Sequence, residues 1–467
     1  MAKEKTGYRI DMLHGPLAGK LLLFALPLML SSLLQLLFNA ADVVVVGRYV
    51  GKQALAAVGS NTALINLLVN LFVGFSVGAN VIVARDMGAG QEEDVRRSVH
   101  TALTVALLSG VFLAVVGLTL ARTLLVLTSS PEDVIDLATL YLRIYFCGMP
   151  ANMFYNFGAA ILRAQGDTRR PLYFLTTAGV VNVGLNLIFV IGLQMSVAGV
   201  ALATIISQYI SAVLIFICLM RDQGPLHFDF HCLQLDKRTI KRVLQVGLPA
   251  GFQGLVFSLS NVVIQSAINS FASTVVAGST ASANIEGFVY ASMNAFYQST
   301  LTFVSQNYGA GQCRRVDRVL GLCLLYVSAT GLLLGLLVAS CGHTLAGIYA
   351  PGDEAVIGYA MERLWYVCSP YFLCGVMEVF VGALRGIGYS VIPMVVSMVG
   401  ACGLRLLWIA TVFQVYQVPA VLYVSYPVSW IVTAAVQMTF FLIVRKHAYA
   451  KVAGIHGIDG QPTAGTP

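Results

Sequence analysis

The stretch LLLFALPLMLSSLLQLLFNA, residues 21–40, carries no charge and is as long as the roughly 20 residues that a helix needs to cross a membrane. Eleven further apolar stretches follow it, separated by short polar turns. Of the 467 residues, 58% are hydrophobic and 10% charged, whereas a soluble domain carries about 25% charged residues. Because no backbone group can stay unpaired in lipid, we expect an all-α integral membrane protein with twelve transmembrane helices.

The predicted helices divide the chain into two lobes of six. We expect a cytoplasmic N-terminus at 1–16, an N-lobe at 17–220, a cytoplasmic linker at 221–242, a C-lobe at 243–444 and a largely disordered cytoplasmic tail at 445–467. The start of the chain resembles a secretory signal, but its apolar run continues without a cleavage site. It is therefore expected to remain as the first helix.

The basic residues predict the topology. Of the 28 Lys and Arg, 22 lie on the side of the predicted membrane that holds both termini, and only Arg48, Lys52 and Arg122 lie opposite. The positive-inside rule then places both termini on the cytoplasmic side of the membrane. The same topology explains the formal net charge of +7 without a nucleic-acid partner.

An internal repeat relates the two lobes. Leu26-Pro27 recurs as Leu248-Pro249, and LRAQGDTRRP at 162–171 shares its Leu-Arg, Gly and Pro with LRGIGYSVIP at 384–393, each 222 residues later. Six helices separate equivalent positions, so we expect two lobes related by a pseudo-two-fold axis along the membrane normal. Pro27 and Pro249 are expected to kink their helices, because proline removes a backbone hydrogen bond.

Asp42 is the sharpest candidate for coupling to an ion. Gln35, Asn39 and Asp42 share one polar stripe of the first helix, and a carboxylate at membrane depth is costly and functional by default. The alternative is that Asp42 caps the outer helix end beside Arg48. Further oxygen ligands for a proton or sodium ion are offered by Asn182, Asn186 and Thr204, whose alternative role is interhelical hydrogen bonding.

Other polar residues are candidates for a substrate cavity. The predicted cavity residues are Gln35, Asn39, Asn156, Asn261, Gln265, Glu286, Tyr290 and Tyr297. Glu286 and the two tyrosines share one helix face that suits an amphipathic cation, or that forms a packing stripe with one acid. Glu378 and Arg405 lie deep enough to need partners, and we expect them to form an intramembrane ion pair. Arg363 is nearer a helix end and is expected to snorkel to the interface.

Enzyme and metal signatures are weak. His227, His231 and Cys232 have a metal-like spacing but lie in the linker without further ligands, so no metal, cofactor or catalytic residue is predicted. No phosphate-binding loop is present in the sequence. Energy for transport must then come from ions.

The chain resembles the multidrug and toxic compound extrusion (MATE) family, in particular its bacterial DinF-like and Firmicutes-type members. The resemblance covers residues 15 to 445 and rests on LPLMLSSLLQLLFNAADVVVVGRYVG at 26–51, ILRAQGDTRRP at 161–171, GVALATIISQ at 199–208 and MEVFVGALRGIGYSVIP at 377–393. It implies a monomeric antiporter in the membrane lipid that exports cationic or amphipathic small molecules, by alternating access, in exchange for protons or sodium ions.

The resemblance also assigns an amino-lobe cation site to Asp42, Asn182, Asn186 and Thr204. Asn186 stands where the DinF-like pattern has an aspartate, which leaves Asp42 as the only acid there and favours protons over sodium ions. Two rival functions are a lipid-linked saccharide flippase of the same superfamily and, less favoured, an intramembrane enzyme. The flippase should show more helices and a basic cavity, and the enzyme should show His or Cys at membrane depth.

Overall fold

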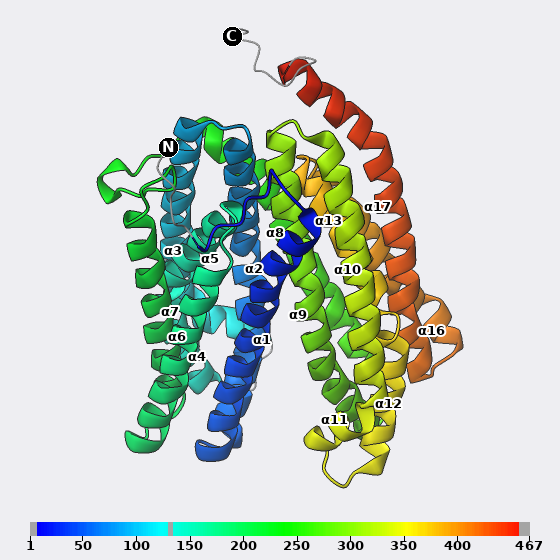
Figure 1. The fold of residues 1–467 in the computed structure, drawn as a ribbon. Helices are drawn as coiled ribbons and strands as arrows, with labels where there is room; N and C mark the ends of the chain where they lie inside the picture. Colours follow the sequence, from blue (N-terminus) through cyan, green and yellow to red (C-terminus); the bar gives the residue numbers. More distant parts are fainter. Residues whose placement is uncertain (1–6, 129–133, 457–467) are drawn as a thin grey trace. The chain divides into compact units, whose positions relative to one another are not determined.

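The computed structural model describes residues 7–128 and 134–456, which fold almost entirely into helices (Figure 1). Of the tail predicted to be largely disordered, residues 445–456 continue the last helix of the chain, and the residues from 457 onward lie outside these ranges. Contacts divide the chain into two compact units: unit 1 comprises Met1–Ile10 and Leu30–Gly251, and unit 2 comprises Asp11–Met29 and Phe252–Pro467.

Unit 1 is built from the first half of the chain. Its helices are most of α1 (Leu17–Tyr49), α2 (Lys52–Gly88), α3 (Glu92–Leu127), α4 (Ile135–Cys147), α5 (Met149–Ala164), α6 (Arg169–Asn186) with the π-helical turn η1 (Leu187–Gly192), α7 (Ser196–Met220), the short η2 (Phe230–Cys232) and the start of α8 (Lys237–Ile268). Buried apolar side chains of α1 to α5, η1 and α7 form one continuous core.

Unit 2 is built from the second half. It contains the start of α1, the rest of α8, α9 (Ser273–Gly309), α10 (Cys313–Ser340), α11 (Gly342–Tyr349), α12 (Glu354–Cys368), α13 (Tyr371–Gly386), α14 (Val391–Ser397), η3 (Met398–Gly403), α15 (Leu404–Ala410), α16 (Val412–Val415) and α17 (Pro419–His456).

Helices α1 and α8 each belong to both units, whereas the predicted lobe boundaries assigned each of these helices to a single lobe. The division falls after Met29 in α1 and after Gly251 in α8, two residues beyond Pro27 and Pro249 respectively. A proline inside a helix removes one backbone hydrogen bond and weakens that turn. Each shared helix therefore changes from one unit to the other next to its own weakest turn.

Small residues let α2 and the first part of α8 pack closely within unit 1. A Cβ atom on Gly74 would lie 2.3 Å from the backbone nitrogen of Gly251, and one on Gly78 would lie 2.2 Å from the carbonyl oxygen of Val243. Glycines four residues apart are typical of close helix contacts in membranes. Asp86 and Arg242 fix the same contact with two hydrogen bonds of 2.5 and 3.2 Å.

The described residues contain nine helices that are long and apolar enough to cross a membrane, or ten if the bent pair α12 and α13 counts as one span. Two of the twelve predicted spans fail this test for visible reasons. The apolar stretch at residues 138–161, one of the twelve, is broken at Gly148 into α4 and α5. The stretch at residues 275–304 lies in α9, which is continuous but rich in serine, threonine and asparagine.

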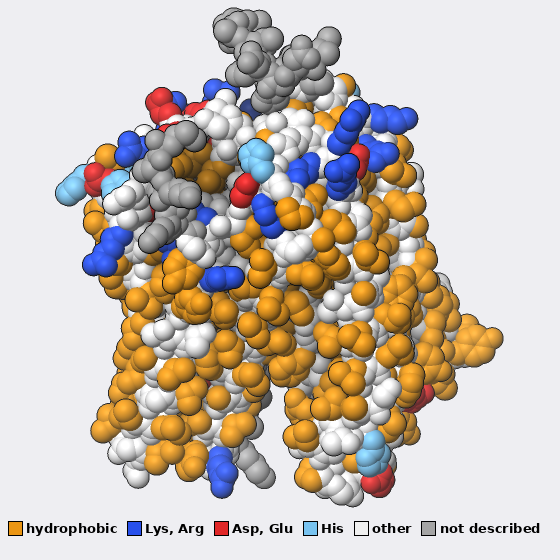
Figure 2. Space-filling model, in the orientation of Figure 1, with side chains coloured by type: hydrophobic (Ala, Val, Ile, Leu, Met, Phe, Trp, Pro, Cys, Tyr) orange, Lys and Arg blue, Asp and Glu red, His pale blue; other side chains and the backbone are white. Residues whose placement is uncertain are grey.

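Charged side chains are unevenly distributed along each unit. In Figure 2, apolar side chains cover most of the visible length of each unit, while Lys and Arg gather mainly near one end. Large apolar side chains lie on the surface, such as Leu118 in α3 at 44% exposure and Leu333 in α10 at 69%, as expected of residues that face lipid.

Candidate functional site

The four residues predicted to form the cation site lie together in unit 1. Asn186 donates from Nδ2 to Asp42 Oδ1 at 2.5 Å and to Asn182 Oδ1 at 3.2 Å. Asn182 in turn donates to the Thr204 hydroxyl at 3.5 Å. This chain of hydrogen bonds joins α1, α6 and α7 through a single carboxylate, so a change in the charge of Asp42 acts on three helices.

Asn186 leaves an acceptor free at this site. Its side chain is buried, and its Oδ1 atom has no hydrogen-bond partner among the described residues. A buried acceptor without a donor is costly unless a ligand supplies one. The geometry thus offers Asp42 and Asn186 oxygens to a proton carrier or a small cation.

Two tyrosines near Asp42 were missed by the sequence analysis. Tyr141 and Tyr145 of α4 lie close enough to Asp42 for its charge to act on their phenol groups, and their rings stack with centroids 6.0 Å apart. Tyr145 also hydrogen-bonds the side chain of Gln208 in α7. Their spacing of four residues on one helix face was visible in the sequence, but nothing there indicated that this face meets α1.

The main ion pair of unit 2 joins two residues that the sequence analysis did not pair. Arg363 of α12 donates to both carboxylate oxygens of Glu286 in α9, at 2.7 and 3.1 Å, and to Ser279 at 2.5 Å. Ser282 donates a further hydrogen bond to Glu286. Arg363 is only 5% exposed, so the expectation that it snorkels to the interface is wrong: its guanidinium stays inside because Glu286 neutralises it there.

The predicted ion pair of Glu378 with Arg405 is also wrong. No salt bridge within 4.0 Å joins these two among the described residues. Arg405, 3% exposed, donates from Nε to Ser429 and lies over the Tyr426 ring, 4.3 Å from its centroid. Aromatic faces of α17 thus hold the charge that a carboxylate was expected to hold.

Glu378 instead belongs to a second polar cluster, around Arg385 of the same helix. Arg385 interacts electrostatically with Glu378 and donates to the Tyr297 hydroxyl at 2.6 Å and to Gln253 at 2.7 Å. Tyr290, 42% exposed, lies close enough to Glu378 for its charge to act on the phenol group. Three predicted residues, Glu378, Tyr290 and Tyr297, therefore lie in one cluster, while Glu286 lies in another.

The remaining predicted cavity residues have few side-chain contacts in the structure. Gln35, Asn39 and Asn261 are exposed, Gln265 donates to Asn269 just after the end of its own helix, and Asn156 donates to Asn152 in its own helix. Their place in a substrate cavity stays a prediction.

A family model matches the chain twice, over residues 27–188 and 249–410, and its description is MatE. The chain belongs to the MatE family. The two matches begin 222 residues apart, at Pro27 and Pro249, which is the spacing of the repeat found in the sequence. The predicted family is confirmed, and as a MatE member the protein is a membrane transporter and not an enzyme.

Curated relatives of this MatE chain include transport proteins of two kinds. The chain is 28% identical over 436 residues to the probable multidrug resistance protein YoeA of Bacillus subtilis, covering 91% of this chain and 93% of the relative. It is 24% identical over 394 residues to an FAD transporter of Shewanella oneidensis, covering 84% and 87%. The relatives span nearly the whole chain.

Solved structures show the same fold. A MATE transporter crystallised with MaL6 superposes with a TM-score of 0.88 at 20% identity, covering 94% of this chain and 98% of that one. An outward-facing multidrug resistance MATE transporter of the MOP superfamily also gives 0.88, at 21% identity, covering 96% and 100%. The twelve-helix, two-lobe fold class predicted from the sequence is confirmed.

Proposed function

We propose that the protein exports cationic or amphipathic drugs and toxic compounds across the bacterial plasma membrane, in exchange for protons, with both termini in the cytoplasm. The observation that carries the proposal is the hydrogen-bonded chain from Asp42 through Asn186 and Asn182 to Thr204. Relatives named as probable multidrug resistance proteins support the substrate class, and 22 of 28 basic residues on one predicted side support the orientation.

The chemistry of the site explains how a proton biases the transporter. An ionised Asp42 accepts the Asn186 amide hydrogen bond, whereas a protonated Asp42 is neutral and has its own proton to donate. Protonation therefore removes the charge assistance from this bond between α1 and α6, which as a bond to an ionised group contributes about 1.5–3 kcal/mol. Helix α1 has its weak turn at Pro27, where it passes between the units, so it can rearrange when this bond weakens.

Alternating access requires that the proton and the drug favour different states, because a ligand of equal affinity for both states shifts neither. A cationic drug and a proton both neutralise Asp42, so they compete for its charge. A membrane potential of 100 mV contributes about 2.3 kcal/mol per charge, and a tenfold drug gradient costs about 1.4 kcal/mol. Exchange of one proton for a neutral amphipathic molecule moves one net charge, so this potential sustains a gradient of more than tenfold. Exchange of one proton for a monovalent cation moves no net charge and is driven by the pH gradient alone.

Sodium is the alternative coupling ion. The unpartnered Oδ1 of Asn186 favours it, because an amide oxygen can ligate a cation beside the Asp42 carboxylate. A single acid argues for the proton, which neutralises one carboxylate fully without further ligands.

The test is ethidium accumulation in everted membrane vesicles under an imposed proton gradient or an imposed sodium gradient. We expect proton-driven accumulation in the wild type and its loss in Asp42→Asn. Asp136→Asn is the matched control, because this exposed carboxylate pairs only with Arg122 in the described residues. Accumulation driven by sodium alone would replace the proton in the proposal, and no accumulation with either ion would overturn drug antiport.

A second candidate is export of an anionic cofactor. Three buried arginines, Arg363, Arg385 and Arg405, and two buried glutamates, Glu286 and Glu378, lie in the helices of unit 2, which leaves one positive charge in excess. The similarity to an FAD transporter points the same way. This candidate would be favoured if FAD inhibited ethidium transport by the wild type and if FAD no longer inhibited transport by Arg405→Gln.

A further inference from the structure

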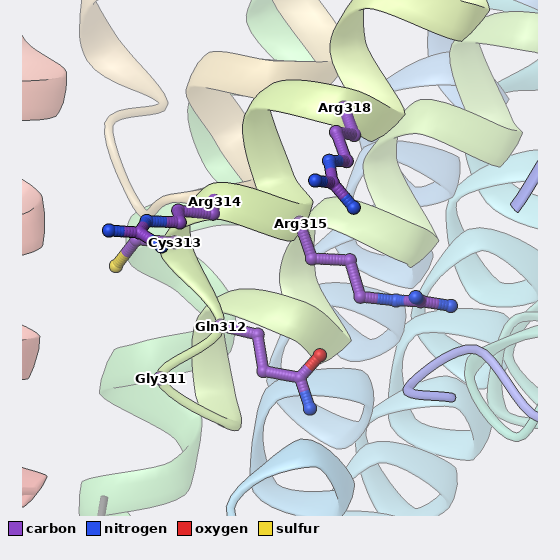
Figure 3. Close-up of a pocket in the computed structure, with 6 residues that line it drawn as sticks. All are labelled: Gly311, Gln312, Cys313, Arg314, Arg315 and Arg318. Carbon is purple, nitrogen blue, oxygen red and sulfur yellow. The ribbon is translucent and has the colours of Figure 1, made fainter. Parts of the chain in front are cut away.

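The start of α10 forms an open, basic hollow on unit 2. It has a volume of about 470 Å³ and is lined by Gly311, Gln312, Cys313, Arg314, Arg315 and Arg318. Figure 3 shows the three arginines coming from the first two turns of α10, with the guanidinium of Arg314 pointing away from that of Arg315. No acidic residue lies in the first turn of this helix.

Of the charged groups at the start of α10, Arg315 and Asp317 already have partners, whereas Arg314 and Arg318 have none that would neutralise them within the described residues. Arg315 donates to the backbone carbonyls of Met12, His14 and Gly15, and so anchors the segment that leads into α1. Asp317 accepts from Arg445 and from the Tyr449 hydroxyl. Arg314 and Arg318 are exposed, and no ion pair or hydrogen bond is recorded for either within the described residues.

The repeat shows that this charge pattern is specific to the second half. The equivalent helix in unit 1, α3, begins with Glu92, Glu93 and Asp94, and Glu93 forms an ion pair with Arg97 four residues later. Arg314 and Arg318 stand 221 residues after Glu93 and Arg97. An attractive pair in the first half is thus replaced by two like charges, next to the positive end of the helix dipole, where acids are preferred.

An anion between Arg314 and Arg318 would relieve their mutual repulsion and their repulsion by the helix dipole. The neighbouring surface of α10 indicates which kind of anion binds there. Leu325 and Leu332 follow Arg318 by seven and fourteen residues on the same helix face and are 61% and 45% exposed. At 1.5 Å per residue, Leu325 lies about 10 Å from Arg318 along the axis, so exposed apolar surface begins within two helical turns of the charge. A charged head and an apolar tail therefore fit this face together.

We propose that Arg314 and Arg318 bind the phosphate headgroup of an anionic phospholipid whose acyl chain lies along the Leu325 and Leu332 face of α10. Basic residues at a membrane surface attract anionic lipids with about 1 kcal/mol each. The site is specific to unit 2, because the equivalent position in unit 1 already carries its own carboxylates.

The experiment measures the thermal unfolding of the purified full-length protein in detergent with added phosphatidylglycerol, phosphatidylcholine or inorganic phosphate. A ligand that binds only the folded state raises the unfolding temperature with its concentration. We expect a rise with phosphatidylglycerol alone. In Arg314→Gln/Arg318→Gln we expect its affinity to fall about thirtyfold, and native mass spectrometry to show one bound lipid fewer.

Two variants make the result decisive. Arg97→Gln, at the equivalent position of unit 1, should keep the phosphatidylglycerol response. Arg314→Glu should reproduce the Glu93–Arg97 pair with Arg318, so that the lipid-free protein is at least as stable as the wild type while the lipid response is lost. The proposal is overturned if the double variant responds like the wild type, if phosphatidylcholine is equally effective, or if inorganic phosphate alone reproduces the rise.

Discussion

The amide Nδ2 of Asn186 lies 2.5 Å from Oδ1 of Asp42, although 144 positions separate the two residues in the sequence. The contact joins α6 to the part of α1 that belongs to unit 1. Through this contact the protonation state of Asp42 affects the packing of α1 against α6. The residue at position 186 decides whether the site contains one acid or two.

Asn186→Asp should change the ion that drives transport. The substitution places a second carboxylate beside Asp42, and two adjacent acids repel each other unless a cation or a proton lies between them. We expect ethidium accumulation in everted vesicles to become responsive to a sodium gradient. Asn156→Asp is the control, because this residue hydrogen-bonds only within its own helix in the structure. A variant that remains insensitive to sodium would show that residue 186 does not select the ion.

Glu286→Gln should destabilise unit 2 strongly. The substitution leaves the Arg363 guanidinium buried without a carboxylate, and breaking a buried ion pair from one side costs about 3–5 kcal/mol. The measurement is thermal unfolding followed by labelling of buried thiols such as Cys368 and Cys374. In Glu286→Gln/Arg363→Met the stranded charge is gone, so most of the loss should be recovered. Equal losses in the single and double variants would contradict a mutual pair.

Arg405 should couple to Tyr426 and not to Glu378. A double-mutant cycle with Arg405→Gln and Tyr426→Leu should give an interaction energy of about 1–2 kcal/mol, because the buried Arg405 guanidinium lies over the Tyr426 ring. The corresponding cycle with Glu378→Gln should give an energy near zero. The reverse order of the two energies would restore the ion pair expected from the sequence.

Gly110→Ala should weaken the packing of α3 against α5. The added Cβ atom would lie 2.4 Å from Cα of Pro150, a backbone atom that cannot move aside cheaply. Overpacking of this kind costs about 1–3 kcal/mol. Gly184→Ala is the control, because its Cβ meets no atom within 4 Å, and it should be neutral or gain up to about 1 kcal/mol from helix propensity. Matching unfolding temperatures for the two variants would show that the close contact at Gly110 has no energetic weight.

The cation-site residues could be predicted because their signals lie within single helices. Asn182 and Asn186 are four residues apart, and Asp42 ends a polar stripe, so each polar face was visible from helical spacing alone. The repeat showed which positions of the two halves correspond, since one family match begins at Pro27 and the other at Pro249. The tyrosines at 141 and 145 were missed because aromatic residues are common in membrane helices and their spacing did not distinguish a site from packing.

What the sequence by itself determined is the helical membrane fold, the two-fold repeat and the polar faces, because length, hydropathy and helical spacing are local properties of the chain. Only the tertiary structure decided which charges meet. Glu286 pairs with Arg363, 77 residues away, while Arg405 lies on Tyr426. The rotation of each helix about its axis, and its choice of neighbours, arise from side-chain packing between segments far apart in the sequence. The sequence of a single helix therefore does not determine its rotation or its neighbours.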